Sequence, residues 1–399
     1  MTEPRRIERV AAKGDGVTAD GRHVAFTAPG DMVAADGTII PGPHHVDPPC
    51  RHFARCGGCQ LQHLNETALT DFVTQRVLNA AQSHGLEPEQ FLPVHLSPPR
   101  SRRRATLHGL RTGKGFALGF KEQRSQRIID IHECHVLTPS LWNIVEPLRE
   151  LLARLADRKP IDVSLTQIEQ GADCHIRGLE AAGPVDYEHL TQFARANHLA
   201  RLTLDQGYGA QPLWEPEPAI VALSGHSVPF PPASFMQPTM DGERQLTSDV
   251  FEFLTAAENI TDLFSGLGTF AFALMSAGRR ITAIEASRDA HIACRQGAKG
   301  MAGQLRTAHR DLFRAPLQTS ELDEFDGVVL DPPRAGARQQ VAQLAQSNVV
   351  RIAYVSCNPS SWARDSKTLV DSGYRLERLR PVGQFRWSTH VELTSLFVR

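Results

Sequence analysis

Residues 259–278, NITDLFSGLGTFAFALMSAG, combine an apolar strand, a glycine-rich turn and the start of a helix. Gly266 and Gly268 follow the apolar run directly, and glycines in such a turn let the backbone pass close to a ligand. Open α/β sheets bind their ligands at this place, beyond the carboxyl ends of the strands. The stretch therefore predicts a doubly wound α/β domain with a ligand site at its first strand-to-helix turn.

The residues after this turn favour S-adenosylmethionine (AdoMet) as the ligand. A second apolar strand ends at Glu285, where an acid can accept both ribose hydroxyls of a nucleoside. A third strand would end near Asp311, in a suitable position to meet an adenine edge. The third glycine of a dinucleotide fingerprint is missing, which argues against NAD. On these residues alone, the alternative is a generic α/β domain with an ordinary strand, turn and helix.

Two further strands end in residues that carry chemistry. The strand in FDGVVLDPPRAG (325–336) ends at Asp331, ahead of two prolines that stiffen the loop and hold the carboxylate at the crevice. The strand in VVRIAYVSCNPS (349–360) places Cys357 beside the same crevice. Cysteines after apolar strands are more often packing residues. A helix starting just after Cys357 would lower the pKa of its thiol, however, and the thiolate is the form that attacks.

A reactive thiol beside a methyl donor suits methylation of a pyrimidine carbon. Carbon 5 of uracil is too weakly nucleophilic to take a methyl group from a sulfonium, whereas thiolate addition to C6 places negative charge on C5. A base must afterwards remove the C5 proton so that the cysteine can leave, and His390 and Glu392 are two candidates for it. The alternatives are an amino-group methyltransferase, which needs no thiol, and an RNA-binding assembly factor without turnover.

Taken together, these motifs resemble the RumA/TrmA family of RNA uridine-5-methyltransferases, in the family's order and over nearly the whole chain. The matching segments are SFMQP (234–238), DLFSGLG (262–268), DPPRAG (331–336), SCNP (356–359) and HVE (390–392). The resemblance implies that Cys357 is the nucleophile and that Glu392, rather than His390, accepts the proton. It also implies AdoMet contacts from five residues, namely Gln237, Phe264, Glu285, Asp311 and Asp331.

The resemblance also orders the chain into three parts. Residues 1–49 alternate short β-like runs with turns and resemble the first half of a TRAM domain, an OB-like barrel that binds RNA. Residues 50–230 mix strand-like and helical stretches, which indicates an α+β middle domain. Residues 231–399 form the predicted Rossmann-like class I AdoMet methyltransferase domain. We expect the shortened N-terminus either to form an incomplete barrel or to leave RNA binding mainly to the middle domain.

Four of the seven cysteines form a ligand-like set. Cys50, Cys56 and Cys59 follow a Cys-x5-Cys-x2-Cys pattern, and Cys134 is a candidate fourth ligand. Four thiolates suit a [4Fe–4S] cluster or an all-cysteine zinc site, and the spacing favours iron–sulfur because only one short Cys-x2–4-Cys pair is present. The rRNA-modifying members of the family are similar, with a [4Fe–4S] cluster at these positions. This favours a uridine in 23S rRNA over the T-loop uridine of tRNA as the substrate.

Charge is concentrated in one stretch, which we call the basic segment (residues 100–127). The whole chain has a net charge of −1, but this segment carries nine Lys and Arg residues against one acid. Such a segment suits phosphate contacts, so Arg102, Arg103 and Arg104 are predicted to contact RNA; the alternative is a solvated basic hairpin. Because no signal-like or membrane-spanning apolar run is found, we expect a cytoplasmic protein, and we expect it to act as a monomer.

Overall fold

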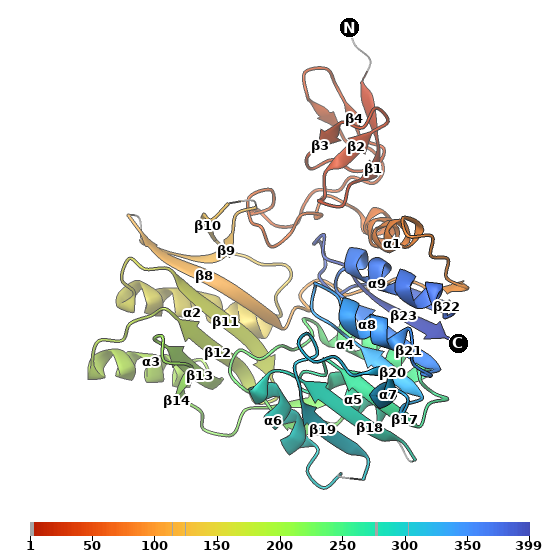
Figure 1. Cartoon of the computed structure of the whole chain (residues 1–399). Helices are drawn as coiled ribbons and strands as arrows, with labels where there is room; N and C mark the ends of the chain where they lie inside the picture. The colour runs from red at the N-terminus through yellow and green to blue at the C-terminus, as the bar shows by residue number, and fades with distance from the viewer. Residues whose placement is uncertain (1–3, 114, 124, 276–277, 302) are drawn as a thin grey trace.

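The computed structural model describes five stretches of the chain, which are residues 4–113, 115–123, 125–275, 278–301 and 303–399. Lys114 and Arg124 of the basic segment lie outside the described residues. Within the described part, the strands form a small N-terminal sheet, a middle sheet, a two-stranded hairpin and a large C-terminal sheet (Figure 1). None of the helices found there has the length and apolar character that a membrane span requires.

The C-terminal sheet confirms the predicted Rossmann-like domain. Its strand order is β19-β18-β17-β20-β21-β23-β22-β6, and β7 also pairs with β22. The five strands from β17 to β21 run parallel, whereas β23 is antiparallel to both β21 and β22. Their bounds are β17 Asn259–Leu263, β18 Arg280–Glu285, β19 Leu305–His309, β20 Gly327–Leu330, β21 Arg351–Ser356, β22 Arg375–Gly383 and β23 Glu392–Val398.

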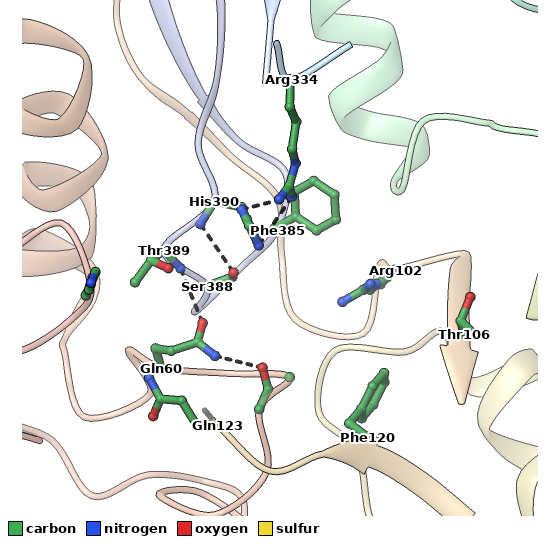
Figure 2. Close-up of a pocket in the computed structure, with 13 residues that line it drawn as sticks. Gln60, Arg102, Thr106, Phe120, Gln123, Arg334, Phe385, Ser388, Thr389 and His390 are labelled. Atoms are coloured by element: carbon green, nitrogen blue, oxygen red, sulfur yellow. Dashed lines mark hydrogen bonds between the residues drawn. The ribbon is translucent and has the colours of Figure 1, made fainter. Parts of the chain in front are cut away.

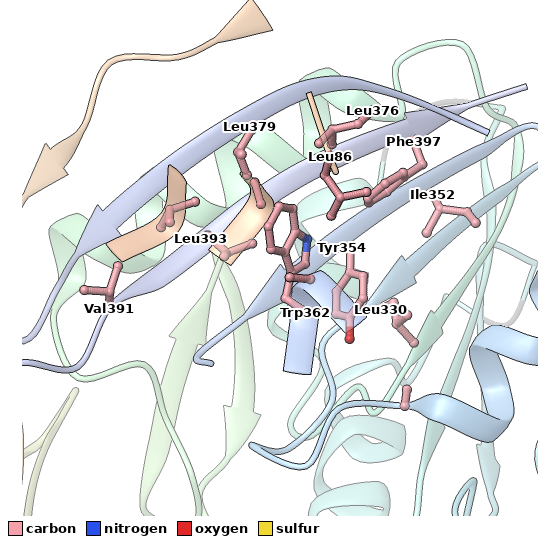
Figure 3. Close-up of a cluster of buried hydrophobic side chains, with 14 of the residues drawn as sticks. Leu86, Leu330, Ile352, Tyr354, Trp362, Leu376, Leu379, Val391, Leu393 and Phe397 are labelled. Carbon is pink, nitrogen blue, oxygen red and sulfur yellow. The ribbon is translucent and has the colours of Figure 1, made fainter. Parts of the chain in front are cut away.

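Both faces of this sheet are covered, which explains why its central strands are apolar throughout. Along β21, Ile352 and Tyr354 belong to one hydrophobic core and Ala353 and Val355 to the other, because successive side chains point to opposite faces. Figure 3 shows the first core, in which Trp362 packs beside Tyr354. The helices of this part are α4 Met240–Phe253, α5 Thr269–Leu274, α6 Arg288–Gly297, α7 Thr319–Leu322, α8 Arg338–Leu344 and α9 Pro359–Asp371.

A segment from the first quarter of the chain completes the C-terminal sheet. Helix α1 (Glu66–Gln82) packs on α9 and β22 and contributes Leu69, Phe72 and Val77 to the same core as Trp362. The short strands β6 (Gln90–Phe91) and β7 (His95–Leu96) then pair in parallel with β22. The chain therefore starts to build the core of the C-terminal sheet before it enters the middle sheet.

The middle sheet has the α+β character that the sequence predicts. Its order is β10-β9-β8-β11-β12-β13-β14, mostly antiparallel, with β12 and β13 parallel. Helices α2 (Pro139–Leu155) and α3 (Pro184–Ala196) pack on its strands and bury its apolar side chains. The strand bounds are β8 Arg104–Thr112, β9 Gly115–Lys121, β10 Ile128–Asp130, β11 Ile161–Ile168, β12 Gly171–Arg177, β13 Leu199–Asp205 and β14 Gln211–Trp214. The hairpin of β15 (Ile220–Leu223) and β16 (His226–Pro229) follows.

The N-terminal sheet is a half-barrel, in agreement with the expected shortened TRAM-like part. Five short strands lie in the order β3-β2-β1-β4-β5, and within the described residues the outer strands β3 and β5 do not pair. Buried Asp31 holds the turns of this half-barrel together, since its carboxylate accepts hydrogen bonds from the amides of Ala28 and Gly42, both at 2.7 Å. The strands are β1 Arg5–Val10, β2 Gly16–Thr18, β3 His23–Val24, β4 Met32–Val33 and β5 Ile39–Ile40.

Candidate active site

The strand order of the C-terminal sheet brings the predicted catalytic residues to one edge. Strands β20 and β21 are parallel neighbours, so Asp331 and Cys357, which follow them, lie at the same carboxyl edge. Because β23 runs antiparallel to β21, its first residue reaches this edge too, and the register pairs Ser356 with Leu393, next to Glu392. A thiol and two carboxylates from three strand ends thus meet beside the turn that follows β17.

The glycine turn after β17 leaves backbone exposed to a ligand. Gly266 and Gly268 have positive φ values of 55° and 93°, a conformation that L-amino-acid side chains rarely adopt. A Cβ on Gly268 would lie 2.9 Å from the sulfur of Cys294, whereas the space beside Gly266 is open. The Glu285 carboxylate accepts hydrogen bonds from the amides of Gly266 (2.9 Å) and Ser287 (2.6 Å) and keeps lone pairs for ribose hydroxyls. The turn therefore fits a nucleoside.

An aromatic pair lies beyond this turn. Phe264, itself at a positive φ of 65°, faces Phe313 with ring centroids 5.4 Å apart, and both rings line one cavity. Asp311 accepts a hydrogen bond from the Phe313 amide at 3.0 Å, so it fixes the loop that carries this ring. Phe264 and Asp311 were predicted from the sequence as site residues, whereas Phe313 was not. An aromatic residue two positions after the acid of the third strand is the signal that would have found it.

Burial raises the pKa values of three carboxyl groups around the crevice. It raises the pKa of Glu392 to about 7, although a hydrogen bond from Gln384 and the charge of Arg334 act in the opposite direction. Burial and the nearby Glu392 raise the pKa of Asp331 well above its usual value, and burial raises that of Asp262 to about 8. A carboxyl group with a pKa near 7 can both take up and release a proton at neutral pH, as general base catalysis requires.

The Cys357 thiol does not have the lowered pKa that the sequence analysis predicts. Burial, together with Glu392 and Asp331, raises the pKa of the half-buried thiol to about 11, and Arg334 offsets only part of this. The prediction is wrong because burial and the two neighbouring carboxyl groups oppose the charged thiolate. At the start of α9, Asn358 already accepts the Ser360 amide hydrogen bond at 3.1 Å, and Pro359 has no amide hydrogen, so neither Ser360 nor Pro359 offers an amide to the sulfur.

His390, the second candidate for the base, already accepts a hydrogen bond from Arg334. The Arg334 guanidinium donates to its Nδ1 atom at 3.1 Å, and burial together with Arg334 lowers the pKa of His390. A neutral imidazole that accepts a hydrogen bond from an arginine has its lone pair occupied. The geometry therefore favours Glu392 over His390 as the proton acceptor.

Three hydrogen bonds join the loops that carry Asp331 and Cys357. Asn358 Nδ2 donates to the Arg334 carbonyl at 2.9 Å, and the Ala337 amide donates to Asp365 at 2.8 Å. The Arg364 guanidinium donates to the Ala335 carbonyl at 3.0 Å. These contacts hold the two loops in one arrangement, and the sequence analysis assigned no role to the residues that make them.

A cavity of about 620 Å³ opens beside this crevice (Figure 2). Its lining residues come from the half-barrel, the cysteine-rich loop, the middle sheet and the C-terminal part of the chain. The lining residues are Lys13, Gly57, Gly58, Gln60, Arg102, Thr106, Phe120, Gln123, Arg334, Phe385, Ser388, Thr389 and His390. Three of them are cations, and no Asp or Glu is among them. Cations, aromatic rings and amides without acids suit the phosphates and bases of a nucleic acid.

The basic segment serves two purposes. Arg102 lines this cavity and lies over the Phe385 ring at 5.3 Å, and Arg104 lies over the exposed ring of Phe235 at 4.7 Å. Arg103 was predicted to contact RNA, but this prediction is wrong. Its buried side chain pairs with Glu243 at 2.6 Å and donates to the Gln237 carbonyl at 3.1 Å, so it holds the fold together.

The four cysteines of the ligand-like set line a second, smaller cavity. Cys50, Cys56, Cys59 and Cys134 all border it, and Phe120 closes one side. Burial raises the pKa of Cys59 to about 12 and that of Cys50 to about 11. Across the described residues, however, no group of three or more His, Cys, Asp or Glu side chains is arranged to hold a metal ion. The donor set is of the right chemical kind, but the thiols do not form a closed ligand group.

Three comparisons with known proteins agree with this geometry. Residues 226–399 match the family of tRNA (Uracil-5-)-methyltransferases. An uncharacterized RNA methyltransferase of Zymomonas mobilis is 43% identical over 99% of this chain and all of its own. A 23S rRNA (uracil(1939)-C(5))-methyltransferase of Thiobacillus denitrificans is 35% identical over 90% of this chain and 87% of its own.

One solved structure matches the whole fold. It is the tRNA (uracil-54, C5)-methyltransferase of Pyrococcus abyssi in complex with S-adenosyl-L-homocysteine, with a TM-score of 0.75 and 23% identity, covering 99% of this chain and all of that one. This similarity concerns the fold, whereas the two closer sequence relatives show the family. The chain belongs to the TrmA/RumA family of RNA (uracil-5-)-methyltransferases, which methylate C5 of uracil in RNA with AdoMet as the methyl donor.

Proposed function

We propose that this RNA uracil-C5 methyltransferase acts through Cys357 as the nucleophile and Glu392 as the base, on a uridine of 23S rRNA. The observation that supports the assignment of roles is the meeting of the two side chains at one sheet edge, where the Glu392 carboxyl group helps to raise the pKa of the Cys357 thiol. The crevice between them is also bordered by Asp331, from the neighbouring strand end.

The methyl-donor side of the crevice has the groups that a nucleoside needs. We assign the contacts with AdoMet to Gln237, Phe264, Glu285, Asp311 and Asp331. Glu285 would accept hydrogen bonds from the ribose hydroxyls, and Phe264 would pack against the adenine ring, since these side chains border the open turn at Gly266. When bound, AdoMet supplies an electrophilic methyl group beside Cys357.

Cys357 then activates the uracil ring. Its thiol gives its proton to water, and the thiolate forms a bond to C6. The electron pair left on C5 then forms the new bond to the methyl carbon, as the bond from that carbon to the sulfonium sulfur breaks. Glu392 next takes the proton from C5, and the electrons of that C–H bond restore the C5–C6 double bond while the S–C6 bond breaks. A base with a pKa of about 7 suits this last step at neutral pH.

RNA reaches the crevice through the large cavity in our proposal. A uridine inside folded RNA must leave its stack before Cys357 can attack C6. The cavity adjoins Arg334 and His390 of the catalytic loops, and its cations and aromatic rings come from several parts of the chain. We propose that residues 1–49 and 50–230 bind RNA and that residues 231–399, acting within a monomer, carry out the chemistry.

Replacing Arg102 with alanine should weaken RNA binding without changing AdoMet binding. Arg102 lines the cavity, so its loss removes one phosphate or base contact, lowers RNA affinity about fivefold and reduces the slope of log Kd against log salt by about one. Arg195→Ala is the matched control, because it removes the same charge from an exposed position on α3. Fluorescence anisotropy over a range of salt concentrations gives both values. Equal RNA affinity of the two variants would remove Arg102 from the interface.

The identity of the RNA can be tested directly. We expect the purified protein to transfer labelled methyl groups from AdoMet to a 23S rRNA fragment and to leave unmodified tRNA transcripts nearly unlabelled. The 35% identity to a 23S rRNA methyltransferase supports this expectation. Preferential labelling of tRNA would overturn the rRNA assignment, whereas labelling of neither RNA at uracil C5 would contradict the proposed roles of Cys357 and Glu392.

We assign a [4Fe–4S] cluster to Cys50, Cys56, Cys59 and Cys134. Four thiols around one cavity support it, and thiolates are the ligands that such clusters require. When bound, the cluster would join the loop at Cys50–Cys59 to Cys134 and so stabilise the wall of the large cavity. Iron and sulfide analysis of protein purified without oxygen tests the assignment, and a stoichiometric zinc content without iron would overturn it.

A further inference from the structure

We propose that Gln384 is a positioning residue for the base: its buried side-chain amide links Glu392 to Gln237 and thereby aims the carboxylate into the crevice. This inference rests on the proposed role of Glu392. It concerns a residue that neither the motifs of the sequence nor the family comparison assigns to the reaction.

The backbone places Gln384 beside the base. Gln384 comes directly after β22, and the register of β22 and β23 pairs Val382 with Glu392. The Gln384 side chain is 1% exposed, so its amide must find its partners inside the protein. Its Nε2 donates to Gln237 Oε1 at 2.9 Å, and the Glu392 carboxylate accepts a hydrogen bond from the same side chain.

These contacts also fix which way the amide points. The two hydrogens of Nε2 serve two acceptors, Gln237 Oε1 and the Glu392 carboxylate. The opposite orientation would turn Gln384 Oε1 toward the ionised Glu392 carboxylate, which repels it. In the orientation observed, Oε1 has no hydrogen-bond partner among the described residues. A buried acceptor without a partner costs stability, and the hydrogen bonds of the donor end oppose that cost.

The surroundings leave the side chain little freedom. A Cβ on Gly242, in the first turn of α4, would lie 2.7 Å from Gln384 Oε1 and 2.8 Å from Gln384 Cβ. Gln237 is held in turn, since Arg103 donates to its carbonyl at 3.1 Å and to the Pro238 carbonyl through its own amide at 2.8 Å. The buried pair of Arg103 and Glu243 therefore supports the base from a distance.

The hydrogen bond has a defined effect on the chemistry. A donor to a carboxylate favours its ionised form, and Glu392 must be ionised before it can accept the C5 proton. The other charged or titratable groups that act on this region are Arg334, which also favours ionisation of Glu392, and Asp331 and Cys357. Without Gln384, Arg334 alone would oppose the effect of burial.

Replacing Gln384 with methionine tests the inference, because methionine keeps the length of the side chain and removes the donor. We expect the pH at which turnover reaches half of its maximum to rise by about one unit, and kcat at pH 7 to fall by about fivefold, with KM for RNA and AdoMet unchanged within about twofold. The sign follows from the base: turnover increases as Glu392 ionises, and the variant ionises at higher pH. Raising the pH should therefore restore the activity of Gln384→Met.

Gln170→Met is the matched control. The Gln170 side-chain amide bonds the backbone of Pro218 and Ile220, and Gln170 borders neither the large cavity nor the cavity at Phe264. Its replacement should lower the thermal unfolding midpoint but leave the pH profile in place. If Gln384→Met does not fold, Gln384→Asn, which withdraws the amide by one methylene group, should shift the profile in the same direction.

The outcomes separate this inference from the proposed function. An active wild-type enzyme whose pH profile is unchanged in the Gln384 variants would overturn the positioning role alone, as would an equal shift in Gln170→Met. A wild-type enzyme that forms no 5-methyluridine would instead contradict the proposed function.

Discussion

Cys357→Ala should abolish methyl transfer, with a fall in kcat of at least about 10⁴-fold, while AdoMet still binds with an affinity close to that of the unchanged protein. The reason is chemical, because without a thiolate on C6 the C5 atom of uracil does not become nucleophilic enough to take a methyl group. The thiol stands at the end of β21, beside the crevice and outside the glycine turn, so its removal leaves that turn intact.

Two measurements check this result. Transfer of labelled methyl groups to RNA gives kcat, and isothermal titration calorimetry gives the affinity for AdoMet. Cys174→Ala is the control, because Cys174 is fully buried in the core of the middle sheet and borders neither cavity at the crevice. Full turnover by Cys357→Ala would contradict the covalent mechanism and favour methylation of an amino group.

Glu392→Gln should trap the enzyme on its RNA. The variant can still add Cys357 to C6 and place the methyl group on C5, but it has no base for the C5 proton, so the S–C6 bond cannot break. We expect resolution of the adduct to slow by about 10³-fold, within the range that general base catalysis contributes. Glutamine keeps the size of the side chain, and the buried position of Glu392 favours an uncharged group.

A denaturing gel shows the trapped species as a slowly migrating RNA–protein band. The band should be absent from the double variant Cys357→Ala/Glu392→Gln, which lacks the attacking sulfur. His390→Gln provides the second comparison, since His390 is bonded to Arg334 at the cavity and its loss should affect RNA binding rather than adduct resolution. A band in His390→Gln and none in Glu392→Gln would make His390 the base.

The functional assignments that can be made from the sequence alone are those that depend on short stretches of the chain. Gly266 and Gly268 predict a ligand turn because only a glycine-rich backbone bends there at positive φ without strain. Asp331 and Cys357 were placed correctly because each follows an apolar parallel strand, and the carboxyl ends of such strands meet at one edge. The half-barrel was also expected, since residues 1–49 are too few for a complete barrel of this kind.

Other predictions failed or were missing because they depend on contacts between distant segments. The raised pKa of the Cys357 thiol comes from Glu392 and Asp331 as well as from burial, and none of these is visible in the SCNP motif. Arg103 stands in a run of three arginines that look alike in sequence, but the path of residues 236–243 buries it against Glu243. Gln384 gains its role only because β22 pairs with β23.

By itself, the sequence determined the chemistry that is available: a nucleoside-binding turn, a thiol, and acids at strand ends, each set by a local pattern of apolar residues, glycines and prolines. Tertiary structure decided which of these groups act on one another. The antiparallel β23 carries Glu392 to the edge where Cys357 lies, and burial there raises the pKa of this carboxyl group to about 7. The physical reason is that proton affinity depends on solvent and on charges within a few ångströms, which long-range folding alone brings together.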